Sequence, residues 1–515
     1  MSAVYESRQV EGVVEFIQYF AEVFTPINLM ILIFGTIGGL LLGATPGLSP
    51  TMAVALLIPF TFQMEPASSL IMLGAVYTST VAGGAVSGIL VNIPGAPANI
   101  ATIMDGHPMA KQGRATEALH YCFISSLVGG VFGVLLLIFF TPPLAELALK
   151  FGPAELFWIS IFGITIIASL GGGSIVKGLL AGGVGLWLST IGYNPVLGEE
   201  RFVVTEHLAG GIHVIAALIG LFAIPQVLSL VSSSGGAAAA KGKLAELRSH
   251  SVLKSFLYNI TRVKALVVGT VVGSIIGVIP GAGGQIAGLV AYDQTKKMSK
   301  DPSKFGQGEP DGVITAESAN NAMVGPSLVP LLTLGIPGSP TAAVLLGGLL
   351  INGLFPGPDL FTVHAAVTWT FIDSLLVGQV FMMIFGLMIA RYSVFVTRIP
   401  NHVMAAAVIV LAIFGTYSVQ NSISDVVVML VLGTLMYYAA RIGFSAAPLV
   451  LGLILGQLTE TNFLQGRMIA GDDVWGYFID GSISKIVIAL CFLSIAYSIY
   501  NERKQIIKRR REAVA

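Results

Sequence analysis

The sequence contains few charged residues, and this scarcity decides the class of protein. Asp, Glu, Lys and Arg make up 10% of the 515 residues, whereas soluble domains carry about 25%. Hydrophobic residues make up 55% of the chain, and the mean hydropathy is +0.85. This composition excludes a water-soluble fold and predicts an all-α polytopic membrane protein. The 61 glycines and 24 prolines agree with that class, because both residues are commoner in transmembrane helices than in soluble ones.

Cysteines and catalytic motifs are also scarce. Cys122 and Cys491 are the only two cysteines, and each lies in an apolar run, so we interpret them as small packing residues rather than as a disulfide or metal site. An intramembrane enzyme needs a nucleophile with a base, or a metal cluster. The sequence has no His-Glu-x-x-His, no Gly-x-Ser-x-Gly and no Gly-x-x-x-x-Gly-Lys-Ser/Thr motif, and its seven histidines are scattered. We therefore expect that the protein is not an enzyme, does not use ATP directly, and has neither an organic cofactor nor a nucleic-acid partner.

The chain contains one pattern of glycine and proline twice. Glycines 35, 39 and 43 precede Thr-Pro-Gly-Leu-Ser at 45–49, and glycines 269, 273 and 277 precede Ile-Pro-Gly-Ala-Gly at 279–283. A second Pro-Gly break follows each copy, as Ile-Pro-Gly-Ala-Pro at 93–97 and Ile-Pro-Gly-Ser-Pro at 336–340. Four Pro-Gly breaks inside apolar segments, paired two and two, predict an internal repeat.

Basic residues indicate how the two repeats are oriented, because Lys and Arg gather on the cytoplasmic side of a membrane. The loop at 63–66 has no basic residue, whereas the equivalent loop at 296–304 carries four lysines. After the second breaks the order reverses, with Lys111 and Arg114 in the first copy and no base at 352–359 in the second. Equivalent loops therefore lie on opposite faces, which predicts an inverted-topology repeat.

We divide the chain accordingly. Residues 1–232 form the first repeat, with its breaks within 35–104, and residues 265–515 form the second, with its breaks within 269–352 and a basic cytoplasmic tail. Each repeat is expected to hold about four to five further transmembrane helices beside its broken ones. Residues 233–264 are a basic cytoplasmic linker that ends in an amphipathic helix on the inner leaflet. The N-terminus is expected on the periplasmic side and the C-terminus in the cytoplasm.

The lengths around the breaks predict re-entrant hairpins. The arms flanking Pro46-Gly47 are each about 15 residues, or roughly 22 Å of helix, which is short of the roughly 30 Å of hydrocarbon in a bilayer. Non-helical backbone at membrane depth is tolerated only where protein buries it or where it lines an aqueous cavity. Four breaks that converge therefore predict a cavity, although a single break is more simply a kink with a capping hydroxyl.

A broken helix offers unpaired N–H groups with a partial positive charge at the start of its second arm, which suits a carboxylate or phosphate. Carbonyl groups before each break suit Na⁺, the only metal ion that we expect. The expected substrate-binding residues are those of the breaks and the polar residues after them: Pro46, Gly47, Ser49, Thr51, Pro94, Gly95, Asn99, Pro280, Gly281, Gly283, Gln285, Pro337, Gly338, Ser339 and Thr341.

Polar residues between the breaks are candidates for coupling transport to an ion: Thr78, Ser79, Asn92, Glu317, Asn320 and Asn321. An ionisable residue inside a membrane is a functional candidate by default, although Glu317 could also lie solvated at the cytoplasmic interface. We predict that Asp105 and His107, in Met-Asp-Gly-His-Pro, lie in a turn rather than in a proton relay.

These stretches resemble the large membrane subunit of the tripartite tricarboxylate transporters, the TctA family. The resemblance extends over nearly the whole chain and is carried by Gly43–Pro50, Tyr77–Pro97, Gly277–Gly283, Glu317–Ala322 and Gly335–Pro340. It implies a permease of the bacterial inner membrane that works with a small four-helix membrane subunit (TctB-like) and a periplasmic solute-binding protein (TctC-like). It also implies import of citrate or another small carboxylate, driven by a Na⁺ or H⁺ gradient.

Two other functions remain as alternatives. One is an intramembrane enzyme acting on a lipid-linked substrate, which the missing motifs disfavour. The other is a passive anion channel, which inverted broken helices disfavour because they are typical of alternating access. The sequence does not select the carboxylate, the coupling ion, or a rocking or elevator motion.

Overall fold

The computed structural model describes residues 18–170, 174–194, 198–232, 250–279, 283–390 and 400–514. In this part of the chain the fold is helical apart from one short antiparallel pair, β1 (Gly192–Tyr193) and β2 (Glu200–Arg201). Eight of the described helices are long and apolar enough to cross a membrane, or nine spans if the bent pair α11 and α12 counts as one. The prediction of an all-α polytopic membrane protein is confirmed.

In the first half, the predicted breaks lie between separate helices. Helix α2 (Pro26–Ala44) ends before Thr45, α3 (Pro50–Thr61) begins after Ser49, and α4 (Pro66–Val91) ends before the second break. The short η2 (Pro97–Asn99) leads into α5 (Ile100–Lys111), which contains Asp105 and His107, so the prediction of a turn there was wrong. The remaining elements are α6 (Ala115–Ala148), α7 (Pro153–Leu170), α8 (Ile175–Ser189), η3 (Glu206–Leu208) and α9 (Val214–Ser232), and η1 (Ala21–Phe24) precedes α2.

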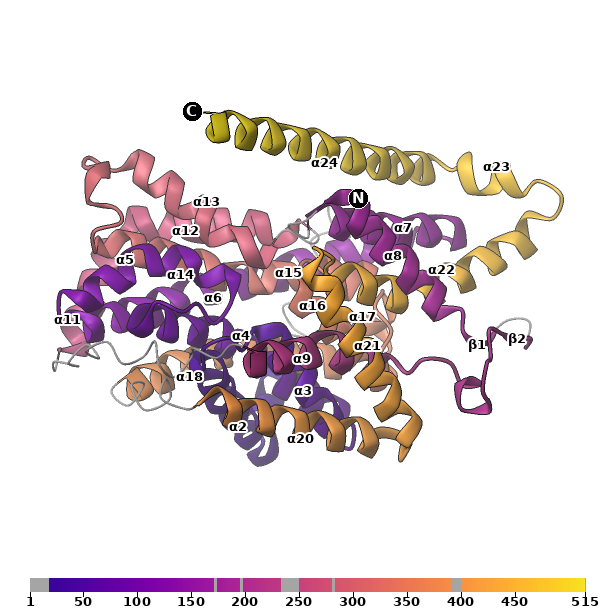
Figure 1. The fold of residues 1–515 in the computed structure, drawn as a ribbon, viewed down its shortest axis with the longest axis horizontal. Coiled ribbons are helices and arrows are strands. Elements are labelled where there is room, and N and C mark those ends of the chain that lie inside the picture. The colour runs from indigo at the N-terminus through magenta and orange to yellow at the C-terminus, as the bar shows by residue number, and fades with distance from the viewer. Residues whose placement is uncertain are drawn as a thin grey trace.

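The second half contains the third and fourth predicted breaks. Helices α11 (Val252–Thr261) and α12 (Val263–Val278) are followed by α13 (Gly283–Met298), α14 (Pro310–Ala322), α15 (Val324–Leu334) and α16 (Pro340–Ile351), with η4 (Pro302–Lys304) before α14. Then come α17 (Asp359–Thr362), α18 (Ala365–Ala390), α20 (Asn401–Gln420), α21 (Ile423–Arg441), α22 (Ala446–Ala470), α23 (Val474–Ile479) and α24 (Ser482–Val514). Figure 1 shows α24 (yellow) along the edge of the molecule, whereas α15 and α16 lie near its centre.

The glycine stripes bring helix backbones into close contact. Helix α2 packs on α4, and α12 packs on α14. A Cβ atom added at Gly43 would lie 2.5 Å from the carbonyl oxygen of Thr80, and one added at Gly277 would lie 2.6 Å from that of Met323. Small residues every fourth position permit such close crossings in membranes, where packing rather than water exclusion drives helix association.

The two second breaks have matching backbone contacts. The N–H of Gly95 donates to the carbonyl of Gly84 at 3.1 Å, and the N–H of Gly338 donates to that of Ser327 at 3.1 Å. Asn92 and Gly335 end the preceding helices in the left-handed conformation, with φ of 60° and 73°, which Asn and Gly adopt most readily. These contacts show one local structure occurring in both halves; the opposite orientation of the halves in the membrane remains a prediction.

The two halves also interlock. Helix α6 of the first half packs on α14 and α15 of the second, and α18 of the second half packs on α4 of the first. Helices α6 and α18 contact each other, and α3 contacts α16. The shorter helices after the breaks, α3, α5 and α16, are therefore held inside a frame of long helices from both halves.

Candidate functional site

A cavity of about 260 Å³ lies where the arms that follow the breaks meet. The predicted residues Ser49, Thr51, Asn99, Ser339 and Thr341 all line it, as does Asn320. The first, second and fourth breaks thus contribute to one space. Of the third break, Pro280 and Gly281 lie outside the described residues. Gly283 and Gln285 lie in the first turn of α13, whose residue Gly288 approaches Ala98 of the cavity wall.

Two helix N-termini from different halves face each other across this cavity. Ser49 caps α3 by accepting the N–H of Met52, and Ser339 caps α16 by accepting the N–H of Ala342 at 3.1 Å. The hydroxyls of Thr51 and Thr341 lie 3.0 Å apart and link the two helix starts. Proline occupies the first helical position in both helices, and Thr51 and Thr341 follow it; because they lie in the first turn, their N–H groups have no intrahelical partner.

The electrostatics of the cavity come from dipoles rather than charges. None of the cavity-lining residues in the described part of the chain is charged. Two helix N-termini that converge supply partial positive charge, together with N–H and O–H donors. Such a site suits a carboxylate without a basic side chain.

Asn320 and Tyr77 supply further polar groups to the same cavity. Asn320 is 1% exposed, and neither atom of its amide has a hydrogen-bond partner among the described residues. A buried amide without a partner is costly, so this side chain is poised for a ligand or water. The hydroxyl of Tyr77 lies 2.8 Å from Ser339 Oγ and 3.2 Å from Ser327 Oγ, which fixes the side of the cavity formed by α4.

The Pro-Gly pairs of the three described breaks lie outside the lining of the cavity. Their residues are Pro46, Gly47, Pro94, Gly95, Pro337 and Gly338. Gly47 adopts φ +84°, and its carbonyl accepts a hydrogen bond from Gln226 Nε2 of α9. Gly95 and Gly338 pack against the carbonyl oxygens of Gly43 and Gly277. These residues shape the turns that present the lining residues.

The predicted ion-coupling residues divide into three groups. Glu317 and Asn321 belong to one buried cluster, in which Thr102 and Ser126 donate to the two carboxylate oxygens of Glu317. Asn321 Nδ2 donates to Ser126 Oγ at 2.7 Å. Asn320, one helical turn from Glu317, lines the cavity instead. The cluster therefore lies directly behind the cavity wall.

The remaining three candidates lie elsewhere. The hydroxyls of Thr78 and Ser79 donate to carbonyls of their own helix, including that of Ala75. Asn92 is exposed and ends α4. The structure does not bring these three side chains to the cavity or to Glu317.

Several lining residues were not predicted from the sequence. Phe222 of α9, Met323, and Ser445, Ala446 and Ala447 at the start of α22 complete the wall. Most are apolar or small and lie in or next to ordinary spans, so no local signal marks them. Tyr77 had a signal, because it is a polar residue in an apolar span. Asp373 of α18 was also missed; it is buried, and its carboxylate has no hydrogen-bond partner in the described ranges.

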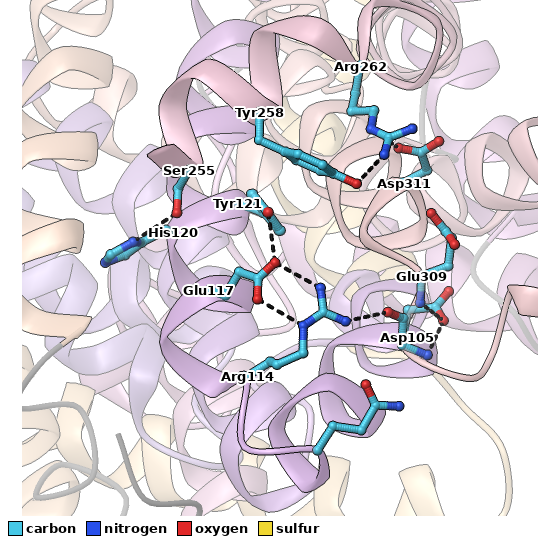
Figure 2. Close-up of polar contacts among 12 residues, drawn as sticks. Asp105, Arg114, Glu117, His120, Tyr121, Ser255, Tyr258, Arg262, Glu309 and Asp311 are labelled. Carbon is cyan, nitrogen blue, oxygen red and sulfur yellow. Dashed lines mark hydrogen bonds and ion pairs between the residues drawn. The ribbon is translucent and has the colours of Figure 1, made fainter. Parts of the chain in front are cut away.

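A buried carboxylate in the middle of α5 binds the loop before α14. Asp105 Oδ1 accepts the backbone N–H groups of Gly306, Gly308 and Glu309 at 2.8, 2.8 and 2.9 Å. Its Oδ2 accepts the hydroxyl of Tyr292 at 2.7 Å. Figure 2 shows Asp105 beside Glu309, with Arg114 and Glu117 next to them. Because α5 begins at the cavity, this contact ties the cavity wall of the first half to the loop before α14 in the second.

Comparisons with known proteins agree with this architecture. The model of the tripartite tricarboxylate transporter TctA family matches residues 29–451. An uncharacterized 52.8 kDa protein in the TAR-I ttuC′ 3′ region of Agrobacterium vitis is 34% identical over 494 residues, which are 95% of this chain and 97% of that protein. An uncharacterized protein in the TAR-II ttuC′ 3′ region of the same organism is 35% identical over 231 residues, 44% of this chain and 96% of that protein. The resemblance seen in the sequence is confirmed, and the chain belongs to the TctA family of tripartite tricarboxylate transporters.

Proposed function

We propose that this protein is the large subunit through which a small di- or tricarboxylate is imported across the bacterial inner membrane, driven by a Na⁺ or H⁺ gradient. Its partners are a small four-helix membrane subunit (TctB-like) and a periplasmic solute-binding protein (TctC-like). Membership of the family supports a multi-pass membrane subunit of a tripartite tricarboxylate transporter. The substrate, the coupling ion, the residues of the site and the sidedness are our proposals.

The observation that carries the proposal is the pair of helix starts facing each other in one cavity. A carboxylate in this space accepts hydrogen bonds from the N–H groups of Thr51 and Thr341 and from their hydroxyls. Asn99 and Asn320 complete the site from α5 and α14. Because the two helix starts belong to different halves, a relative movement of the halves changes the site, as alternating access requires.

Coupling is assigned to the cluster around Glu317. Its carboxylate is fully buried and contacts hydroxyl groups rather than a basic side chain among the described residues. A buried carboxylate without a paired cation is unfavourable in its charged form, so it favours uptake of a cation or a proton. Glu317 and Asn320 lie one turn apart on α14, which connects the ion site to the substrate site.

The proposal is tested by uptake into proteoliposomes that contain the protein and its two partners. A panel of labelled di- and tricarboxylates is offered while the Na⁺ and H⁺ gradients are imposed separately. We expect accumulation of at least one carboxylate under one of the gradients and none without a gradient. Equal uptake with and without a gradient would contradict secondary transport and favour a channel.

Thr341→Val tests the site within the same assay. The substitution removes a hydroxyl that faces the cavity, and the loss of one hydrogen bond to a charged group costs about 1.5–3 kcal/mol, or roughly 10- to 100-fold in apparent affinity. The matched control is Thr333→Val on α15, because that buried hydroxyl donates to the carbonyl of Val329 and lies outside the cavity lining. Equal effects of the two substitutions would refute the assignment.

A further inference from the structure

Helix α11 presents two polar residues inward and three apolar residues outward. Ser255 Oγ lies 3.2 Å from His120 Nδ1, and Asn259 Nδ2 donates to the carbonyl of Tyr121 at 3.2 Å, so both polar residues face α6. The opposite face carries Leu253, Leu257 and Ile260, which are 66%, 57% and 46% exposed. An apolar helix face turned outward beside a membrane span is typical of a helix that lies in the lipid interface.

A polar cleft of about 540 Å³ opens beside the end of this helix. The α11–α12 pair bends by 74° at Arg262, and the cleft lies between this bend, the end of α13 and the start of α14. Its cations are Arg114, Arg262, Lys264, Lys300 and Lys304, and its acidic residues are Asp301, Glu309 and Asp311. The lining therefore has more positive than negative side chains.

Three of the five cations in the cleft form ion pairs, Arg114 with Glu117, Arg262 with Asp311 and Lys304 with Asp301, whereas Lys264 and Lys300 form none among the described residues. The guanidinium of Arg262 stacks on the ring of Tyr258, and its Nε lies 3.5 Å from Asp311 Oδ1. Figure 2 shows these three side chains together. Among the described residues, Lys264 Nζ donates to the backbone carbonyl of Met298 and to no carboxylate. Burial, followed by the nearby charge of Asp311, raises the pKa of Glu309 and weakens its negative charge. A singly or doubly charged anion fits this balance.

A separate apolar groove is lined by the next residues of α12. It has a volume of about 580 Å³ and lies between α6, α12 and α18, with Val131, Leu135, Leu266, Val267 and Val271 among its lining residues. Arg262 and Lys264 line the cleft, and the groove begins at Leu266. At 1.5 Å per residue, the groove residues of α12 lie roughly 6–13 Å beyond Arg262. The basic cleft and the apolar groove are thus lined by successive residues of α12.

We infer that these two spaces form a binding site for one anionic phospholipid, with its phosphate headgroup in the basic cleft and an acyl chain in the groove. The cleft supplies charge complementarity for the headgroup, and basic pockets between transmembrane helices on the cytoplasmic side are known to hold such lipids. The groove supplies an apolar surface that a soluble anion cannot use. The outward apolar face of α11 places the cleft at the level of the headgroups.

Native mass spectrometry of the purified full-length protein in detergent tests this inference. The ligands are phosphatidylglycerol, phosphatidylcholine and soluble glycerol 1-phosphate. We expect phosphatidylglycerol to bind at least tenfold more tightly than phosphatidylcholine, and glycerol 1-phosphate not to bind at matched concentrations. Binding of glycerol 1-phosphate as tight as that of phosphatidylglycerol would assign the cleft to a soluble anion and overturn the inference.

Two pairs of variants separate the headgroup from the acyl chain. Lys264→Gln with Lys300→Gln should weaken phosphatidylglycerol binding about fivefold per lysine, whereas the control Lys297→Gln removes the same charge from an exposed residue outside the cleft. Val267→Phe fills the groove and should weaken both lipids, whereas Ile275→Phe, an exposed position of α12 outside the groove, should not. Equal effects of the variants and their controls would overturn the inference.

The alternative occupant of the apolar groove is the small membrane subunit, because an outward apolar surface also suits contact with another membrane protein. The same lipid titration on the assembled complex decides between them. Retained phosphatidylglycerol binding supports the lipid site, and loss of binding on assembly assigns the groove to the subunit. The assay measures lipid binding and not transport, so its result is independent of the proposed substrate.

Discussion

The contact made by Asp105 gives the sharpest test of how the two halves are held together. Asp105→Ala removes a carboxylate that accepts three backbone N–H groups and one phenolic hydroxyl. The N–H of Gly308 and the hydroxyl of Tyr292 are buried, and an unsatisfied buried donor costs about 1–3 kcal/mol. The N–H groups of Gly306 and Glu309 are only part-buried, and water can replace their acceptor. We therefore expect the substitution to destabilise the contact by about 3 kcal/mol.

Hydrogen–deuterium exchange measures this contact directly. A loss of 3 kcal/mol corresponds to roughly 100-fold faster exchange of the amides at 306–309, because exchange follows the free energy of local opening. Asp105→Asn keeps one oxygen acceptor but no charge, and it should accelerate exchange less. The control is Asp301→Ala in the same loop, an exposed residue whose carboxylate accepts only from Ser303 and pairs with Lys304.

The reasoning would be refuted if exchange at 306–309 in Asp105→Ala changed by less than about threefold from the unmodified protein. It would also be refuted if Asp301→Ala accelerated exchange as much as Asp105→Ala. In the first case the amides at 306–309 would be protected by contacts other than the carboxylate of Asp105, and in the second case by the order of the loop as a whole. The link between α5 and the loop before α14 would then carry no energy of its own.

Four further predictions concern packing, the site, coupling and sidedness. Gly43→Ala should destabilise the protein by about 1–3 kcal/mol in thermal unfolding, because the added Cβ meets a backbone oxygen, whereas Gly38→Ala, with open space around it, should not. Tyr77→Phe removes the hydroxyl that contacts Ser339 and should raise the KM for uptake severalfold at unchanged expression; an unchanged KM would remove Tyr77 from the site. Glu317→Gln should abolish gradient-driven accumulation while the purified protein still binds carboxylate, and normal accumulation would exclude a coupling role. Gln63 and Ser303 are both exposed, and each is replaced singly by cysteine in a protein that lacks Cys122 and Cys491. The two cysteines should react with membrane-impermeant reagents from opposite faces, and reaction of both from the same face would disprove the inverted repeat.

The polar residues after the breaks could be predicted from the sequence because their role is local. A Pro-Gly pair that ends one helix and a hydroxyl residue that caps the next are adjacent in the chain, and Ser49 and Ser339 do cap their helices. The repeated pattern then indicates, from the sequence alone, which positions of the two halves correspond. Residues whose role depends on a distant partner could not be found in this way. Asp105 is satisfied by amides about 200 residues away, and Phe222 reaches the cavity only because α9 packs on α3.

The Pro-Gly pairs were predicted to bind the substrate, and this stays a prediction, although the pairs within the described residues lie outside the cavity lining. The sequence shows that helices break there, and this holds for the three breaks within the described residues. It does not show which atoms of a break face the cavity. Glycine is required at 95 and 338 because each packs on the carbonyl of another helix, where a side chain has no room. The cavity is instead lined by the residues that follow, and the two Thr hydroxyls 3.0 Å apart join the halves there. Glycine thus sets how closely the broken helices approach. If the Ser, Thr and Asn residues bind the substrate, as we propose, substitutions at the two kinds of position should fail in different assays: folding for the glycines, and substrate affinity for the polar residues.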